Sequence, residues 1–173
     1  MNIVLLGYRG TGKSSVARFL ARKLNRKLFC IDELIVESAG MSIPKIVDEL
    51  GWPGFRDIEL RIVEEVSGRA DDGIIDCGGG VVLDERNIRN LRRNGKTVLL
   101  TASFETILKR IHRDPNRPPL KDGLSFEQEQ RQIIEEREDK YRAAADLLVD
   151  TTRGKPQETA MYIVRRFKEM AWI

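Results

Sequence analysis

The sequence has few features that would take the chain out of the cytoplasm. It contains only two cysteines, Cys30 and Cys77, which are too few for a disulfide framework. No apolar run approaches the length of about 18 residues that a membrane-spanning helix requires, and the chain opens on a strand-like segment instead of a signal peptide. The net charge is only +3 and unclustered, which supports neither a nucleic-acid platform nor a polybasic membrane anchor. We expect a reduced cytoplasmic protein that binds neither nucleic acid nor membrane.

The chain is long enough to build a core of its own. Apolar residues make up 41% of the 173 residues, which excludes a short disulfide-held peptide and a disordered tail. The sequence contains no internal repeat and no linker, so residues 1–173 are predicted to form one domain. We expect that domain to be monomeric.

Apolar runs alternate with helical patterns along the chain. Residues 2–6 form a short apolar run that ends in glycine, and residues 14–24 then carry apolar side chains at helical spacing. Further buried strands are predicted at residues 28–31, 73–76, 97–101 and 146–149, each separated from the next by enough chain for a helix. This alternation favours an α/β fold in which helices cover both faces of a parallel sheet, as three layers.

Two stretches, at residues 52–54 and 113–123, interrupt this pattern, and a third segment is a charged helix. Residues 52–54 read WPG and open a helix predicted over residues 55–69. Residues 113–123 are polar and rich in proline, which predicts a mobile loop. Residues 127–142 are dense in opposite charges at i, i+4 spacing, which is typical of a solvent-facing helix.

A glycine-rich stretch links the first predicted strand to the first helix. Residues 7–14 read GYRGTGKS and satisfy G-x-x-x-x-G-K-[ST], in the strand and helix context that this phosphate-binding motif requires. Its backbone N–H groups can surround phosphate oxygens, Lys13 can reach the β and γ phosphates, and the Ser14 hydroxyl can ligate Mg²⁺. The predicted nucleotide contacts are Gly10, Thr11, Gly12, Lys13, Ser14 and Ser15. The alternative is a glycine-rich turn that binds nothing.

The rest of the chain helps to distinguish between a GTPase, an ATPase motor and a small-molecule kinase, all of which contain a phosphate loop. The N-K-x-D sequence with which GTPases read guanine is absent, and a motor would need a second domain or partners. A compact small-molecule kinase that uses ATP and Mg²⁺ fits this length better.

Further motifs follow the phosphate loop in a specific order. They are Asp32 after the second strand, AGMSIPKI at 39–46, GFR at 54–56, CGGGVV at 77–82, NRPPL at 116–120 and EREDKYRAAADLLVD at 136–150. With these motifs the chain resembles the shikimate kinases over nearly its whole length. The resemblance implies a P-loop kinase fold with strand order 2-3-1-4-5, a lid at about 113–123, and ATP-dependent phosphorylation of the 3-hydroxyl of shikimate in aromatic amino-acid biosynthesis.

The resemblance also implies an acceptor site. Its residues are Asp32, Arg56, Gly78, Gly79, Gly80 and Arg137. The two arginines would clamp the acceptor carboxylate, the glycines would let backbone approach the substrate, and the aspartate would orient or deprotonate the reacting hydroxyl. Taken alone, the aspartate could also cap a helix, the glycines could form a flexible turn, and each arginine could lie on the surface.

Three more arginines complete the implied machinery. Arg117 matches the family's lid arginine, which closes over ATP and, with Lys13 and Asp32, forms the predicted catalytic set. Arg110 and Arg153 match positions near the adenine ring, on which a guanidinium plane can stack.

The chain departs from the family at the end of the second strand. Most shikimate kinases carry D-x-D there, whereas this chain reads Cys30-Ile31-Asp32, which retains the substrate aspartate but lacks the one that helps to hold Mg²⁺. Sulfur is a poor ligand for Mg²⁺. Asp76, at a position where the family usually has Ser or Thr, ends the third strand and could hold the metal opposite Ser14; alternatively, it caps the glycine turn.

Two other functions stay open at this point. A gluconate or nucleoside-monophosphate type of kinase would retain the phosphate loop and the lid, but it gives no reason for GFR, the triple glycine and Arg137. A nucleotide-binding regulatory domain with impaired catalysis is suggested by Cys30.

Overall fold

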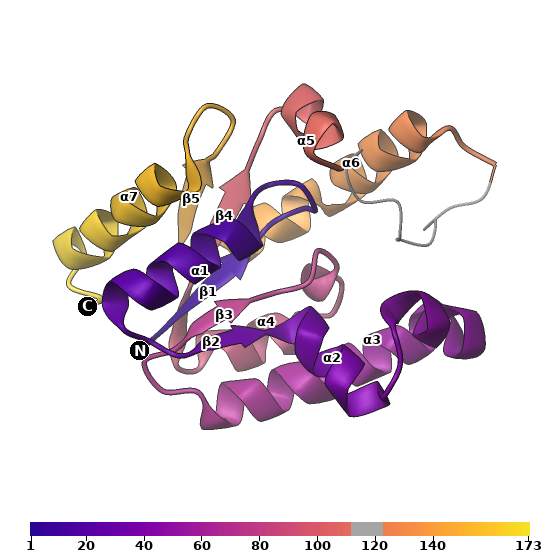
Figure 1. Cartoon of the computed structure of the whole chain (residues 1–173), viewed down its shortest axis with the longest axis horizontal. Coiled ribbons are helices and arrows are strands. Elements are labelled where there is room, and N and C mark those ends of the chain that lie inside the picture. The colour runs from indigo at the N-terminus through magenta and orange to yellow at the C-terminus, as the bar shows by residue number, and fades with distance from the viewer. Residues whose placement is uncertain (112–122) are drawn as a thin grey trace.

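A computed structural model describes residues 1–111 and 123–173 of the chain (Figure 1). The predicted lid at 113–123 therefore lies outside the described residues except for Gly123, and so does Arg117. Among the helices of the two described ranges, none is long and apolar enough to cross a membrane.

A parallel sheet forms the centre of the protein. Its strands are β1 (Asn2–Leu6), β2 (Leu28–Cys30), β3 (Ile74–Asp76), β4 (Gly95–Thr101) and β5 (Leu147–Asp150). They pair in the order β2-β3-β1-β4-β5, which confirms the predicted topology. Because the strands are parallel, their carboxyl ends meet at one edge, and Figure 1 shows both chain termini at the opposite edge. The phosphate loop and the glycine turn lie at the carboxyl edge.

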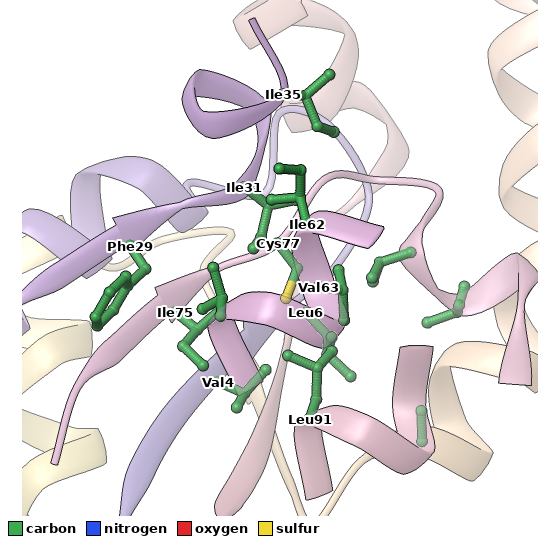
Figure 2. Packing of buried hydrophobic residues seen from close by; sticks show 14 of the residues in the cluster. Val4, Leu6, Phe29, Ile31, Ile35, Ile62, Val63, Ile75, Cys77 and Leu91 are labelled. Atoms are coloured by element: carbon green, nitrogen blue, oxygen red, sulfur yellow. The ribbon is translucent and has the colours of Figure 1, made fainter. Parts of the chain in front are cut away.

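Helices cover both faces of the sheet. Alternate residues of β1 divide between two apolar cores, with Ile3 and Leu5 in one and Val4 and Leu6 in the other. The first core lies beneath α1 (Lys13–Leu24) and α7 (Pro156–Glu169). The second core is completed by α2 (Ile31–Ala39), α3 (Ile43–Arg69), η1 (Val81–Leu83), α4 (Glu85–Arg92), α5 (Phe104–Ile111) and α6 (Phe126–Ala144). In Figure 2, Val4, Leu6 and Ile75 of the strands pack against α3 and α4.

The helix predicted over 55–69 is the second part of a longer, kinked helix. α3 runs from Ile43 to Arg69 and is interrupted at Gly51, whose φ of 67° is left-handed. Pro53 follows in the first turn after the kink, where a missing N–H breaks no hydrogen bond of the second segment. The interruption thus begins one residue before the predicted WPG. It changes the direction of the second segment of α3, which carries Arg56.

The prediction that α6 is merely a solvent-facing helix is wrong. Its surface carries the expected charges, but a buried stripe runs along it, made of Glu129, Gln130, Ile133, Arg137, Tyr141 and Ala144. Because most of these side chains are polar, the stripe has no apolar periodicity for a sequence pattern to detect. Arg137 is only 8% exposed, so the surface-arginine alternative does not hold for it.

Candidate active site

A cleft of about 590 Å³ opens at the carboxyl edge of the sheet. It brings together most of the residues predicted for the two substrates. These are Gly10, Thr11, Gly12, Lys13, Ser14, Ser15, Asp32, Asp76, Gly78, Gly79 and Arg110. Such a position, outside the strand ends of an open α/β sheet, is where ligands bind in this architecture.

The phosphate loop is built from local backbone geometry. Gly12 has a φ of 90° and stands directly before α1, so the helix begins with its free N–H groups at the cleft. The Lys13 ammonium, 8% exposed as a residue, donates to the backbone oxygens of Gly7 at 2.7 Å and Tyr8 at 3.0 Å. The Lys13 ammonium is therefore bound to carbonyl groups of its own loop, close to the place where a phosphate group would bind.

Arg110 braces the phosphate loop against the connection between β5 and α7. One guanidinium nitrogen donates to Gly10 O and to Thr151 Oγ1, both at 3.1 Å, and the other donates to Thr151 O at 2.8 Å. The Thr151 hydroxyl in turn donates to Thr11 O at 2.8 Å. Arg110 thus lies at the predicted nucleotide end of the cleft, as a structural clip. Arg153 is exposed and, in the described part of the chain, does not line the cleft.

Asp32 lies within the first turn of α2, and Cys30 is the residue that precedes that helix as its N-cap. The interpretation of Asp32 as the helix cap is therefore wrong. A carboxylate in the first turn is still favoured by the helix dipole, and Asp32 lines the cleft.

Cys30 and Asp76 occupy directly paired positions on β2 and β3. The Cys30 thiol donates to Asp76 Oδ2 over 3.7 Å. Burial, together with the Asp76 charge, raises the pKa of the Cys30 thiol to about 12. Burial also raises the pKa of the Asp76 carboxyl, while Lys13 and the Ser14 hydroxyl oppose that shift. The pair is thus a neutral thiol against a buried carboxyl group at the floor of the cleft.

The second oxygen of Asp76 is left without a partner. Asp76 is 6% exposed, and its Oδ1 is buried with no hydrogen bond to any residue that the structure describes. That oxygen therefore does not cap the glycine turn. A buried, unsatisfied carboxylate oxygen is costly, and it becomes favourable only when a cation or a donor arrives.

Gly78 and Gly79 of the triple glycine line the cleft, whereas Gly80, Arg56 and Arg137 lie beside it, outside its lining. A Cβ on Gly78 would lie 2.7 Å from Asp32 Oδ1 and 3.0 Å from Glu59 Oε1, and a Cβ on Gly80 would overlap the Arg56 guanidinium. A side chain at either position would therefore push Asp32 or Arg56 away from the turn, and the flexible-turn alternative does not explain these contacts. The turn brings Asp32 and Arg56 to one wall.

Two residues of α6 hold the same turn from the other side. Arg137 donates to Gly79 O at 3.1 Å, and the Tyr141 hydroxyl, one helical turn further on, donates to the same oxygen. Burial raises the pKa of Tyr141 to about 12, so it remains a donor at any physiological pH. Arg56 and Arg137 thus converge on the glycine turn, 81 positions apart in the sequence.

Glu59 is part of this wall although the sequence analysis missed it. It is fully buried in α3, its Oε2 accepts from Arg56 at 2.8 Å, and its Oε1 has no hydrogen bond within the described structure. Burial raises the pKa of Glu59, and Arg56 opposes that rise. One signal was available, because Glu59 falls in the stripe of α3 otherwise occupied by Phe55, Ile58, Ile62 and Val63.

Comparisons with known proteins agree with this site. A family model described as shikimate kinase matches residues 9–168. The shikimate kinase of Chromohalobacter salexigens is 39% identical over 98% of this chain and 93% of its own length, and that of Geobacter metallireducens is 40% identical over 97% and 92%.

Solved structures give the same result. The shikimate kinase from Acinetobacter baumannii in complex with shikimate matches with a TM-score of 0.91 and 32% identity, over 98% of this chain and 93% of that one. The shikimate kinase from Aquifex aeolicus matches with a TM-score of 0.82 and 29% identity, over 99% of both chains. This chain belongs to the shikimate kinase family.

Proposed function

We propose that this protein is a shikimate kinase, which transfers the γ-phosphoryl group of ATP to the 3-hydroxyl of shikimate. The observation that carries the proposal is the glycine turn at residues 78–80, which joins the phosphate loop's cleft to a wall bearing Asp32, Arg56 and Arg137. Two guanidinium groups beside that turn suit an anionic acceptor, and the similarity to shikimate kinases favours shikimate over gluconate or a nucleotide. As a biosynthetic kinase built from one domain, the chain is proposed to act in the cytoplasm as a monomer.

The nucleotide half of the cleft would hold ATP. The N–H groups at the start of α1 face the cleft, and Lys13 can exchange the carbonyls of Gly7 and Tyr8 for the β and γ phosphates. Arg110 fixes the loop against the β5–α7 connection, where Pro156 lines the space proposed for adenine. Arg153 and Arg117 remain proposed contacts of ATP by resemblance, and Arg117 lies outside the described residues.

The acceptor half would bind a hydroxylated carboxylic acid. Arg56 and Arg137 supply donors for the carboxylate, and the backbone of residues 78–80 allows the ring to approach without an intervening Cβ. Asp32 accepts a hydrogen bond from the reacting hydroxyl, orients its oxygen and takes its proton as phosphorus is attacked. Because phosphoryl transfer makes little covalent demand on the protein, this positioning and the charge of Lys13 supply most of the catalysis.

The site fits Mg²⁺, which when bound neutralises charge on the phosphates. Ser14 and Asp76 are the residues that would hold it, because Asp76 offers a buried oxygen with no partner in the described structure. Asp76 is paired with Cys30 in the strand register. Its carboxylate could therefore replace the aspartate that most shikimate kinases carry at the position of Cys30. If this is right, Asp76→Asn raises the Mg²⁺ concentration needed for ATP turnover. An unchanged Mg²⁺ dependence would discard Asp76 as a ligand.

A coupled ADP-release assay with shikimate tests the function directly. We expect shikimate-dependent ADP release that is absent with gluconate or a nucleoside monophosphate as acceptor. Release with one of those acceptors instead would identify another small-molecule kinase. ATP binding without transfer to any acceptor or to water would identify a regulatory nucleotide-binding domain.

A further inference from the structure

A thiol and a carboxyl group lie side by side in the cleft, and the thiol is not a ligand that Mg²⁺ prefers. Cys30 lines the same cleft as Ser14 and Asp32, and its thiol lies 3.7 Å from Asp76 Oδ2. Mg²⁺ prefers oxygen ligands throughout, whereas a thiol beside a carboxylate suits softer divalent ions such as Zn²⁺ and Co²⁺.

A second observation points to a cation at this place. Asp76 lines the cleft and is more than nine-tenths buried, and its Oδ1 has no hydrogen-bond partner among the described residues. The paired strand positions fix the carboxyl group and the thiol side by side, so one ion can contact both.

We propose that Cys30 and Asp76 together bind a thiophilic divalent cation, Zn²⁺ above all, and that this ion competes with Mg²⁺. The sulfur–metal bond forms as the thiol proton passes to solvent, and no electron transfer is involved. Only the competition with Mg²⁺ rests on the proposed function; the binding itself does not. In a cell, the site would make phosphoryl transfer sensitive to free Zn²⁺.

The nucleotide is expected to complete the coordination. Within the described part of the chain, no three histidine, cysteine or acidic side chains are grouped so as to hold a metal by themselves. Zinc sites use about four ligands, so phosphate oxygens and water must supply the remainder. Binding is therefore expected to be tight only when ADP or ATP occupies the cleft.

The other cysteine supplies an internal control. Cys77 also contributes to the lining of the cleft, but it is 2% exposed, and Figure 2 shows its sulfur turned toward Leu6 and Val63 in the apolar core. Since the chain has two cysteines, Cys30→Ser leaves Cys77 as the sole thiol. The replacement keeps the size of the side chain, and thermal unfolding of the variant checks that the fold is retained.

Cobalt gives a readout that does not depend on activity. Co²⁺ is titrated into the full chain with ADP present, and thiolate-to-cobalt charge transfer is followed in the near ultraviolet, beyond the absorption of adenine. We expect a band that saturates at one ion per chain in the wild type, is absent in Cys30→Ser and is weaker in Asp76→Asn. No band in the wild type, or a band that persists in Cys30→Ser and so belongs to Cys77, overturns the proposal.

Inhibition by Zn²⁺ tests the competition. Turnover at fixed Mg²⁺ is measured against Zn²⁺ concentration, each variant being referred to its own rate without Zn²⁺. Losing the thiol should raise the Zn²⁺ concentration for half inhibition by about tenfold or more. Cys30→Asp, which places two carboxylates side by side, should also need a higher Zn²⁺ concentration for half inhibition than the wild type. Equal Zn²⁺ sensitivity of the wild type, Cys30→Ser and Cys30→Asp would refute competition between Zn²⁺ and Mg²⁺ at this site. Failure of shikimate turnover would leave the cobalt result intact, so the two proposals fail separately.

Discussion

The two halves of the cleft are built in opposite ways. The phosphate-binding part of the nucleotide half comes from one continuous stretch, residues 7–15, in which backbone N–H groups and Lys13 follow directly from a strand-to-helix turn. The acceptor half combines Asp32, which lines the cleft, with a wall beside the cleft that comes from α3, the glycine turn and α6, and it extends in sequence from Asp32 to Arg137. The first half depends on local geometry, and the second on tertiary packing.

This difference predicts how each half fails. A change in the nucleotide half should remove chemistry and leave the fold intact, because its key groups contact the loop's own backbone. A change in the acceptor half should alter both binding and stability, because its arginines contact buried partners such as Glu59 and the Gly79 carbonyl. The predictions below test that contrast.

Lys13→Met should have the largest effect on rate. Removing one preorganised donor from the transferring phosphoryl group costs about 3 kcal/mol of barrier, or on the order of 100- to 1,000-fold in kcat. Methionine keeps the length of the side chain, so thermal unfolding should change little. Measuring kcat and the melting temperature together tests this; a large loss of stability would show that Lys13 is also structural.

Gly80→Ala should be the most damaging small change in the acceptor half. The added methyl group would overlap the Arg56 guanidinium and push it off the turn. A displacement of about 1 Å in a positioning group costs up to about 100-fold in kcat/KM. We expect the loss mainly in KM for shikimate, with the KM for ATP nearly unchanged.

Gly68→Ala is the matched control for that substitution. Gly68 lies in α3, and a Cβ there would meet nothing within 4 Å. Alanine at that site should leave kinetics unaltered and stabilise the helix by up to about 1 kcal/mol. If Gly80→Ala behaves like Gly68→Ala, the close packing of Arg56 on the turn is irrelevant to acceptor binding.

The same contrast explains what the sequence could predict. The strands were predictable because buried parallel strands are continuous apolar runs, and the phosphate loop because its motif is contiguous. The register that pairs Cys30 with Asp76 was not, since it depends on which strands become neighbours. Glu59 was missed because an Arg three residues before a Glu is common on helix surfaces, although the place of Glu59 in the apolar stripe of α3 was a signal that it is buried.

The ion pair of α3 gives the next effect in size. Arg56→Met leaves the Glu59 carboxylate buried without its cation, which should destabilise the fold by about 2 kcal/mol, less than for a fully buried pair because Arg56 is 23% exposed. The double variant with Glu59→Gln should recover most of that loss. Urea unfolding of the four proteins measures the coupling; strict additivity would show that the two side chains do not stabilise each other.

The smallest expected effect is the contribution of Glu59 to the pH dependence of folding stability. Because burial raises the pKa of Glu59 above its ordinary value of 4.5, the folded protein keeps this proton to higher pH than the unfolded chain does. Between pH of about 4.5 and the pKa of Glu59 in the folded state, the unfolded chain binds fewer protons than the folded protein does. The free energy of unfolding therefore decreases as pH rises through this range.

Glu59→Gln removes this titration while leaving every other group in place. The difference in unfolding free energy between Glu59→Gln and the wild type should thus move in favour of glutamine as pH rises above about 4.5, and then level off. Subtracting the two curves cancels other titrating groups, Asp76 among them. A difference that is flat with pH, or that moves toward the wild type, would mean that Arg56 outweighs burial and keeps Glu59 ionised, in which case the acceptor wall is held by a full ion pair.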